Sequence, residues 1–239
     1  MITIFKREFK SYFTSVIGYV FFALFMLFYG LFFYMAIMGG ETSGLISSGM
    51  SSFFSMIYLV LTLLIPVLTM RLFSEERKQK TDQILLTSPV NLSQIVLGKF
   101  FSAFAIYSIA VGSTIFVALI IAAFGTLNFV EYLGMVVGLL FIGAALIAVG
   151  SFISSLTESQ VVAAFATFGA IIATFIPSFI ASSVSSPFLS TLFRLISLQT
   201  RYTDFTSGIF DISNILFYLS FTGIFLFLTV RVLEKRRWS

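Results

Sequence analysis

Six stretches of this chain, each about 20 residues long, contain no Asp, Glu, Lys or Arg. A helix needs about 20 consecutive apolar residues to cross the hydrocarbon core of a bilayer, so each stretch predicts one membrane-spanning helix. Their uniform apolar character also argues against a β-barrel, whose strands alternate between apolar and polar residues. We therefore predict an all-α integral membrane protein with one membrane domain over residues 1–239. Its predicted spans are 16–38, 53–70, 100–124, 132–156, 161–180 and 212–230.

The composition narrows the chemistry that such a protein can perform. Apolar residues make up 59% of the chain and charged residues 10%, which is too few charges to cover a water-soluble surface. Because the chain has no Cys and no His, it lacks the usual ligands of zinc and haem, and it has no thiol nucleophile. The sequence therefore predicts no catalytic residue, no metal and no cofactor on this chain.

The basic residues are distributed unequally between the two sides that six spans define. Twelve lie on the side of the termini and two, Arg194 and Arg201, on the other. Basic residues concentrate on the cytoplasmic side of membrane proteins, so we expect both termini in the cytoplasm. The twelve are Lys6, Arg7, Lys10, Arg71, Arg77, Lys78, Lys80, Lys99, Arg231, Lys235, Arg236 and Arg237.

The first fifteen residues predict an amphipathic helix that precedes the first span. Phe5 and Phe9 recur at helical spacing, and Lys6 and Arg7 occupy other positions of the wheel. Two interpretations remain open here. The segment is either a polar flank that orients the first span or a helix that lies in the headgroup plane and contacts a partner.

The predicted cytoplasmic segment 71–99 is the most informative part of the chain. Ser74 is a suitable N-cap for a short helix with acidic residues in its first turn and basic residues after them, and we expect these charges to lie in water. A charged segment is often only a solvated surface, but here apolar residues Ile84, Leu85 and Leu86 follow the charges. A second cytoplasmic turn, Thr157 to Gln160, has the pattern of a capping box and carries Glu158.

The predicted outer segment 181–211 is unusually long. Apolar residues including Leu192 and Phe193 recur at helical spacing after Pro187, which suits a first helical turn. We therefore expect short helices that dip back into the membrane and form a gate; the alternative is an ordinary exposed connection. The predicted gate residues are Leu192, Phe193, Arg201, Gly208 and Asp211.

The spans also lack two features that would suggest an independent transporter. We expect no ionisable residue at bilayer depth, where proton- and sodium-coupled carriers usually hold one. The single Gly-Lys pair, Gly98-Lys99, lacks the flanking residues of a phosphate-binding loop, so energy must come from another protein. Small residues in spans three to five instead predict close helix packing.

Four motifs in this order resemble the membrane subunits of type-2 ABC transporters, and most of all the bacterial permeases of gliding-motility and nitrous-oxide-reductase-maturation systems. The resemblance covers the whole chain. Its motifs are residues 5–10 (FKREFK) with Tyr12-Phe13, the charged loop that ends at Lys99, residues 155–160 (SLTESQ) and residues 205–211 (FTSGIFD).

This resemblance implies a non-enzymatic permease subunit in the plasma (inner) membrane of a bacterium, with export as the expected direction. It implies a homodimer or heterodimer of permease subunits in the lipid bilayer, docked on separate ATP-binding subunits that hold ATP and Mg, with no nucleic acid partner. Loop 71–99 would contain the coupling helix, and the interfacial helix would lie near it. The resemblance does not identify the cargo, and an ATP-independent channel, carrier or membrane assembly factor is the alternative. The expected coupling residues are Glu75, Glu76, Arg77, Lys78, Thr81, Asp82 and Glu158.

Overall fold

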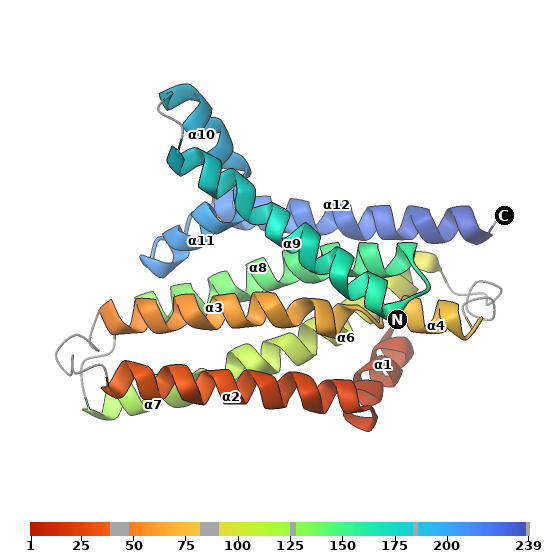
Figure 1. Ribbon diagram of the computed structural model, residues 1–239, viewed down its shortest axis with the longest axis horizontal. Helices are drawn as coiled ribbons and strands as arrows, with labels where there is room; N and C mark the ends of the chain where they lie inside the picture. The colour runs from red at the N-terminus through yellow and green to blue at the C-terminus, as the bar shows by residue number, and fades with distance from the viewer. Residues whose placement is uncertain (39–47, 82–90, 125–127, 184–185, 238–239) are drawn as a thin grey trace.

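The computed structural model describes residues 1–38, 48–81, 91–124, 128–183 and 186–237, and all regular structure in these ranges is helical (Figure 1). Six helical segments of the described chain are long and apolar enough to cross a membrane. The helices are α1 (Ile2–Thr14), α2 (Val16–Met38), α3 (Ser48–Thr69), α4 (Ser74–Lys78), α6 (Leu92–Gly112), α7 (Ile115–Phe124), α8 (Phe129–Leu156), α9 (Gln160–Ser183), α10 (Pro187–Ile196), α11 (Leu198–Thr206) and α12 (Ile212–Arg237).

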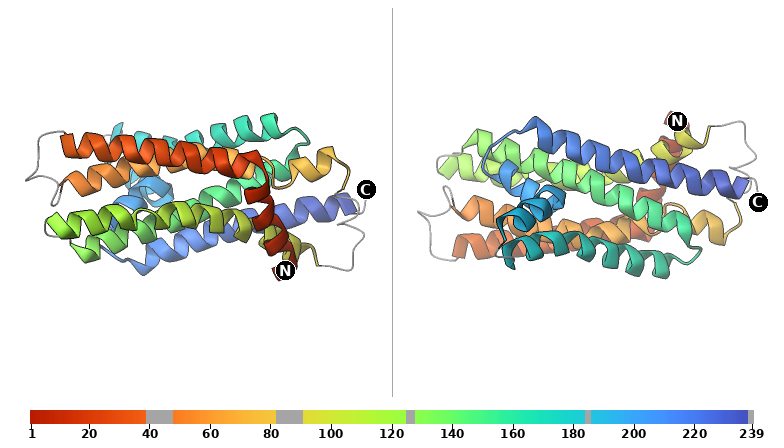
Figure 2. Two further views of the ribbon diagram at one scale, coloured as in Figure 1. Left: turned by 90° about the horizontal axis from the view of Figure 1, so that it is seen from below. Right: turned by 90° about the horizontal axis from the view of Figure 1, so that it is seen from above.

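The long helices run along a common axis, and both termini lie at one end of the bundle together with α1 and α4 (Figure 1). We call this the terminal end, and the other the opposite end. Helix α1 crosses the bundle at a steep angle to α2, as seen in the left view of Figure 2. Helix α9 slants away from the bundle, and α10 projects from its far end (Figure 1).

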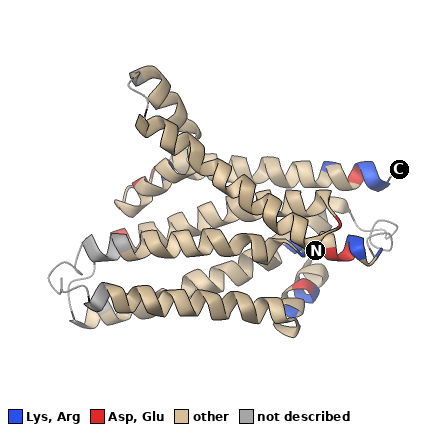
Figure 3. Cartoon of the chain, viewed as in Figure 1, with Lys and Arg blue, Asp and Glu red and all other residues tan. Residues whose placement is uncertain are grey.

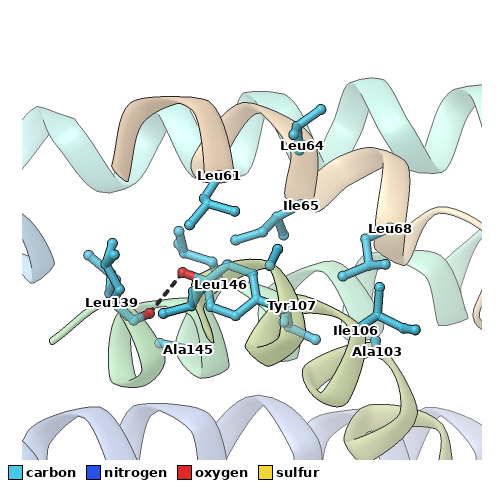
Figure 4. Close-up of a cluster of buried hydrophobic side chains, with 14 of the residues drawn as sticks. Leu61, Leu64, Ile65, Leu68, Ala103, Ile106, Tyr107, Leu139, Ala145 and Leu146 are labelled. Carbon is cyan, nitrogen blue, oxygen red and sulfur yellow. Dashed lines mark hydrogen bonds between the residues drawn. The ribbon is translucent and has the colours of Figure 1, made fainter. Parts of the chain in front are cut away.

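The core lies between α3, α6 and α8. In the most apolar windows of α3 and α8, 67% and 61% of the residues are buried, compared with 17% in α2 and α9 and 11% in α12. Figure 4 shows Leu61 and Ile65 of α3 facing Tyr107 of α6 and Leu146 of α8. The surfaces of α2, α9 and α12 are therefore the ones left for lipid or for another protein.

Small residues allow this close packing, as predicted. A Cβ atom on Gly143 would lie 2.2 Å from the Tyr107 ring, so only glycine leaves room for that ring. The Tyr107 hydroxyl then donates a hydrogen bond of 2.8 Å to the Leu139 carbonyl (Figure 4). Gly150 accommodates Thr69 of α3 in the same way.

The third span differs from the prediction in two respects. Helix α6 begins at Leu92, eight residues before the expected start at Phe100, so that Lys99 lies inside the helix and is buried. This lysine lies near the terminal end of α6, beside α1 and α4, so the expectation of no ionisable residue at bilayer depth stays a prediction. The span is also interrupted between α6 and α7, where Tyr29 donates a hydrogen bond of 3.2 Å to the Ser113 carbonyl.

The other predicted spans agree with the structure to within a few residues, except at the last one. Helix α12 continues beyond residue 230 to Arg237 and carries the basic residues of the C-terminus. Lys and Arg are favourable in the last turn of a helix because of the helix dipole, which explains why the charges do not end it.

Candidate functional site

Charged side chains of the described chain gather at the terminal end, on α1, α4, α12 and the start of α6 (Figure 3). The short helix α4 is at the centre of this region. It lies in the predicted coupling segment and contacts four other parts of the chain. We therefore consider α4 and its contacts as the candidate site.

Helix α4 begins at Ser74 because a neighbouring helix supplies its cap. The backbone N–H groups of Phe73 and Ser74 donate to the Ser154 hydroxyl of α8, at 3.1 and 3.3 Å. The prediction that Ser74 is the N-cap was wrong: Phe73 holds that position, and the Ser74 hydroxyl donates to the Met70 carbonyl instead. Lys80, with a φ of 56°, ends the segment in a left-handed conformation.

Helix α4 is connected to α1 and α6 by four charged residues, which we call the Lys99 cluster: Arg7, Glu8, Glu76 and Lys99. The Lys99 ammonium lies 3.2 Å from Oε1 of Glu8 and 3.0 Å from Oε1 of Glu76. Arg7 contacts the same two oxygens at 2.6 and 2.8 Å. Each carboxylate is thus shared between two cations.

Burial distinguishes this cluster from a surface ion pair. The Lys99 side chain is 1% exposed, and those of Glu8 and Glu76 are 15% and 19% exposed. Burial raises the pKa of the Glu8 carboxyl, but Lys99 and Arg7 lower it by more, so its net pKa is below the ordinary value. The hydrogen bond to Glu8 in turn raises the pKa of Arg7. Both shifts favour the charged forms of Glu8 and Arg7.

Arg71 attaches α1 to the end of α3. Its guanidinium donates to the hydroxyls of Ser11 and Ser15 and forms an ion pair of 3.0 Å with Glu75. It also lies 5.6 Å from the ring centroid of Tyr12, whose hydroxyl donates to the Leu68 carbonyl at 2.9 Å. Helix α1 is thus fixed to both α3 and α4.

Arg77 attaches α4 to the turn between α8 and α9. It forms an ion pair of 3.0 Å with Glu158 and donates to the Leu156 carbonyl at 2.7 Å. The predicted Thr157–Gln160 capping box is not formed. The Thr157 hydroxyl accepts from the amide of Ser159, whose own hydroxyl accepts from Val162, so the cap lies two residues later.

The predicted coupling residues therefore fall into two groups. Glu75, Glu76 and Arg77 bond to other parts of this chain, so the expectation that Glu75 and Glu76 lie free in water was wrong. Lys78, Gln79 and Lys80 are exposed. Thr81 bonds back to the Glu76 carbonyl, while Asp82, the residues Ile84 to Leu86 and Pro89 lie outside the described residues.

The predicted outer segment contains two helices, α10 and α11, beside the opposite half of the bundle (Figure 2). Leu192 is exposed and Phe193 half-buried, on a helix that leaves several large apolar side chains uncovered. Gly208, with a φ of 73°, permits the turn after α11, and the Asp211 carboxylate accepts from the Ser213 amide at the start of α12.

Arg201 fixes α11 to α12. Its guanidinium donates to Oδ1 of Asn214 at 2.8 Å and to the Leu195 carbonyl, and it lies 4.2 Å from the ring centroid of Phe217. Asn214 is buried and donates from its amide group to Asp204 at 2.9 Å. These hydrogen bonds and the ring contact hold α11 against α12. Among the described residues, no ion pair joins α11 to a spanning helix.

An uncharged groove of about 480 Å³ lies between α9 and α11. Phe175 and Phe179 form part of its wall, and the remaining lining consists of hydroxyl and amide side chains: Ser178, Ser182, Gln199, Thr200 and Thr203. The groove therefore offers hydroxyl and amide groups beside two aromatic rings.

Several residues that organise these sites were missed from the sequence. Glu8, Lys99, Ser154 and Asn214 were not among the predicted site residues. Glu8 could have been recognised as the one acid in a basic helix. Asn91 is the N-cap of α6, and a helix that begins there would include Lys99 eight residues later. Ser154 carries no sequence signal, because hydroxyls are common in the spanning helices, whereas Asn214 could have been recognised as an amide near the start of an apolar span.

Comparison with known families gives one result. The family model described as "ABC-2 family transporter protein" matches residues 2–238, which is almost the whole chain. A search of curated proteins finds no match.

Proposed function

This chain belongs to the ABC-2 transporter family, and from that premise we propose that it is a permease subunit whose energy comes from a separate ATP-binding subunit docked at the terminal end. The chain is a multi-pass membrane protein and a membrane transport component of that family. ATP and Mg would be held by the partner, since the sequence offers no phosphate-binding loop.

The position of α4 is the observation that carries this proposal. Helix α4 is bonded to α1, to α6, to α8 and to the turn before α9. A force applied to it would therefore reach three spanning helices and the N-terminal helix at once. This is the arrangement that a coupling helix needs, with Lys78, Gln79 and Lys80 exposed for contact with the ATP-binding subunit.

The rest of the assignment follows the same premise. We place both termini in the cytoplasm of a bacterial plasma membrane, on the basis of the asymmetric basic residues. The sparsely buried helices α2, α9 and α12 would supply the contact with a second permease subunit and the wall of the path. Helices α10 and α11 would form the outer gate, and export would be the direction. The motifs of the gliding-motility and nitrous-oxide-reductase-maturation permeases support that subgroup.

Vanadate-sensitive ATP hydrolysis tests the proposal. We would reconstitute the chain in liposomes with a candidate ATP-binding subunit from the same organism and compare the wild type with the double variant Lys78→Glu/Lys80→Glu. Reversing two exposed charges should weaken association about tenfold and reduce ATP hydrolysis to that of the isolated ATP-binding protein.

The matched control is Lys235→Glu, an exposed lysine at the same end on α12. This variant should retain wild-type hydrolysis. Equal activity in all three proteins would mean that Lys78 and Lys80 do not contact the ATP-binding subunit. Solute movement across the liposome membrane without any ATP-binding protein would favour the alternative, an ATP-independent channel or carrier.

A further inference from the structure

The N-terminal helix has a second surface that the proposed coupling does not use. An apolar groove of about 700 Å³ lies between α1 and α6. Phe5 and Phe9 of α1 form one wall, and Phe101, Phe104 and Ile109 of α6 form the other. Ser108 also contributes, but its hydroxyl donates to the Phe104 carbonyl, so the lining presents little polarity to an occupant.

The groove lies on the membrane side of α1. Glu8 of α1 meets Lys99 of α6, and α6 runs from there toward the opposite end of the bundle. The residues from Phe101 to Ile109 are therefore further from the terminal end than the crossing point. Since α6 begins a predicted span, the groove opens where hydrocarbon would meet the protein.

Two lysines of α1 lie beside residues that line the groove. Lys6 is four residues after Ile2 and three before Phe9, both of which line the groove, and Lys10 is one helical turn further along the same side; both lysines are exposed. No carboxylate in the described ranges forms an ion pair with either of them. Glu8, the acid of the same helix, is turned toward Lys99, and Arg7 is bonded to Glu8 and Glu76.

We propose that this groove binds an anionic phospholipid, with an acyl chain against the aromatic walls and the phosphate at Lys6 and Lys10. The apolar lining suits a hydrocarbon chain, and two exposed cations on α1 that form no ion pair within the described ranges suit a negatively charged headgroup. Long lysine side chains reach the headgroup level while their stems cover apolar surface. The site does not depend on the proposed transport function, because it needs only the placement of the helix in a membrane.

Quenching by brominated lipids tests the site in the full chain. The only tryptophan, Trp238, is replaced by Phe, and Phe101→Trp places a reporter in the groove. The protein is reconstituted in phosphatidylcholine vesicles that contain increasing fractions of brominated phosphatidylglycerol or brominated phosphatidylcholine. We expect phosphatidylglycerol to quench at the lower mole fraction, and Lys6→Gln/Lys10→Gln to reduce this preference by roughly an order of magnitude.

Two controls separate a specific site from general lipid contact. Lys235→Gln removes an exposed lysine at the same end and should leave the preference unchanged. A reporter at Leu27→Trp, on the exposed surface of α2, should be quenched equally by both lipids. Equal quenching by both lipids at Phe101→Trp would overturn the proposal. Absence of quenching there by either lipid would also overturn it, since the groove would then be covered by protein, such as a second copy.

Discussion

At the scale of single residues, Lys99 has the strongest influence on the terminal end. Its ammonium is buried and lies near two carboxylates from different helices. Breaking a buried charge network by removing one member is costly, because the remaining charges stay buried without a partner. Since Arg7 is half exposed, it cannot fully replace the lost cation.

We expect Lys99→Met to destabilise the protein by about 3–5 kcal/mol, the usual cost of an uncompensated buried charge. Thermal unfolding in one detergent measures this effect. Lys235→Met, at an exposed position, is the matched control and should change stability by less than about 0.5 kcal/mol. Similar midpoints for the two variants would show that the Lys99 cluster does not stabilise the fold.

The lowered pKa of Glu8 predicts how stability changes with pH. A carboxyl with a lower pKa in the folded state stabilises the protein above its unfolded pKa, and this contribution is lost as the pH falls through the folded value. The difference in melting midpoint between the wild type and Glu8→Gln should thus be constant from neutral pH to about pH 5. This difference in melting midpoint should shrink at pH values below 4.5, the ordinary pKa of a glutamate carboxyl. A difference that grows as the pH falls would contradict the assignment.

At the scale of elements, α11 depends on glycines of α8. A Cβ atom on Gly134 would lie 2.3 Å from the Phe205 carbonyl oxygen, and one on Gly138 would meet the side chains of Phe205 and Tyr202. Backbone atoms cannot move aside as flexible side chains can. The close approach of α11 to α8 therefore requires glycine at position 134.

Gly134→Ala should displace α11 and cost about 1–3 kcal/mol, the usual range for overpacking. Gly169→Ala on α9 is the control, because a Cβ atom there meets nothing within 4 Å. It should be neutral or should raise stability by up to about 1 kcal/mol, since alanine favours helices more than glycine does. Equal melting midpoints for the two variants would be inconsistent with this packing.

Most of the membrane spans could be predicted from the sequence. Five of the six spans were predicted to within a few residues at most ends, because the apolar length that a bilayer demands can be read directly from the sequence. The start of α6 was missed because Lys99 was counted as a boundary. A buried lysine is tolerated only when acids from elsewhere reach it, and those contacts depend on tertiary structure.

The same limit applies to the candidate site. The segment around Glu75 to Lys78 was found from its charges, but the partners of those charges were not. Ser154 caps α4 from 80 residues away in the chain, and no local pattern encodes such a contact. A sequence does not distinguish a solvent-exposed charge from one that forms an ion pair, and this explains why Glu76 was taken for a solvent-exposed residue.

At the scale of the whole molecule, both termini and α4 lie at one end, and the turn at Gly208 lies beyond α11. We predict that the terminal end is cytoplasmic. Because the natural chain has no Cys, single variants Lys78→Cys and Ile209→Cys can be labelled without background. In intact cells an impermeant thiol reagent should label position 209 and not position 78, and the opposite pattern would invert the topology.

The most direct test of the account is a photo-crosslink from the exposed tip of α4. A photoreactive amino acid at position 79 should form an adduct with the ATP-binding subunit in membranes that contain both proteins. The same group at Leu27, on the exposed surface of α2, should not. An adduct from position 79 alone is the predicted result. Absence of that adduct, or equal adducts from positions 79 and 27, would contradict the claim that α4 receives the ATP-binding subunit.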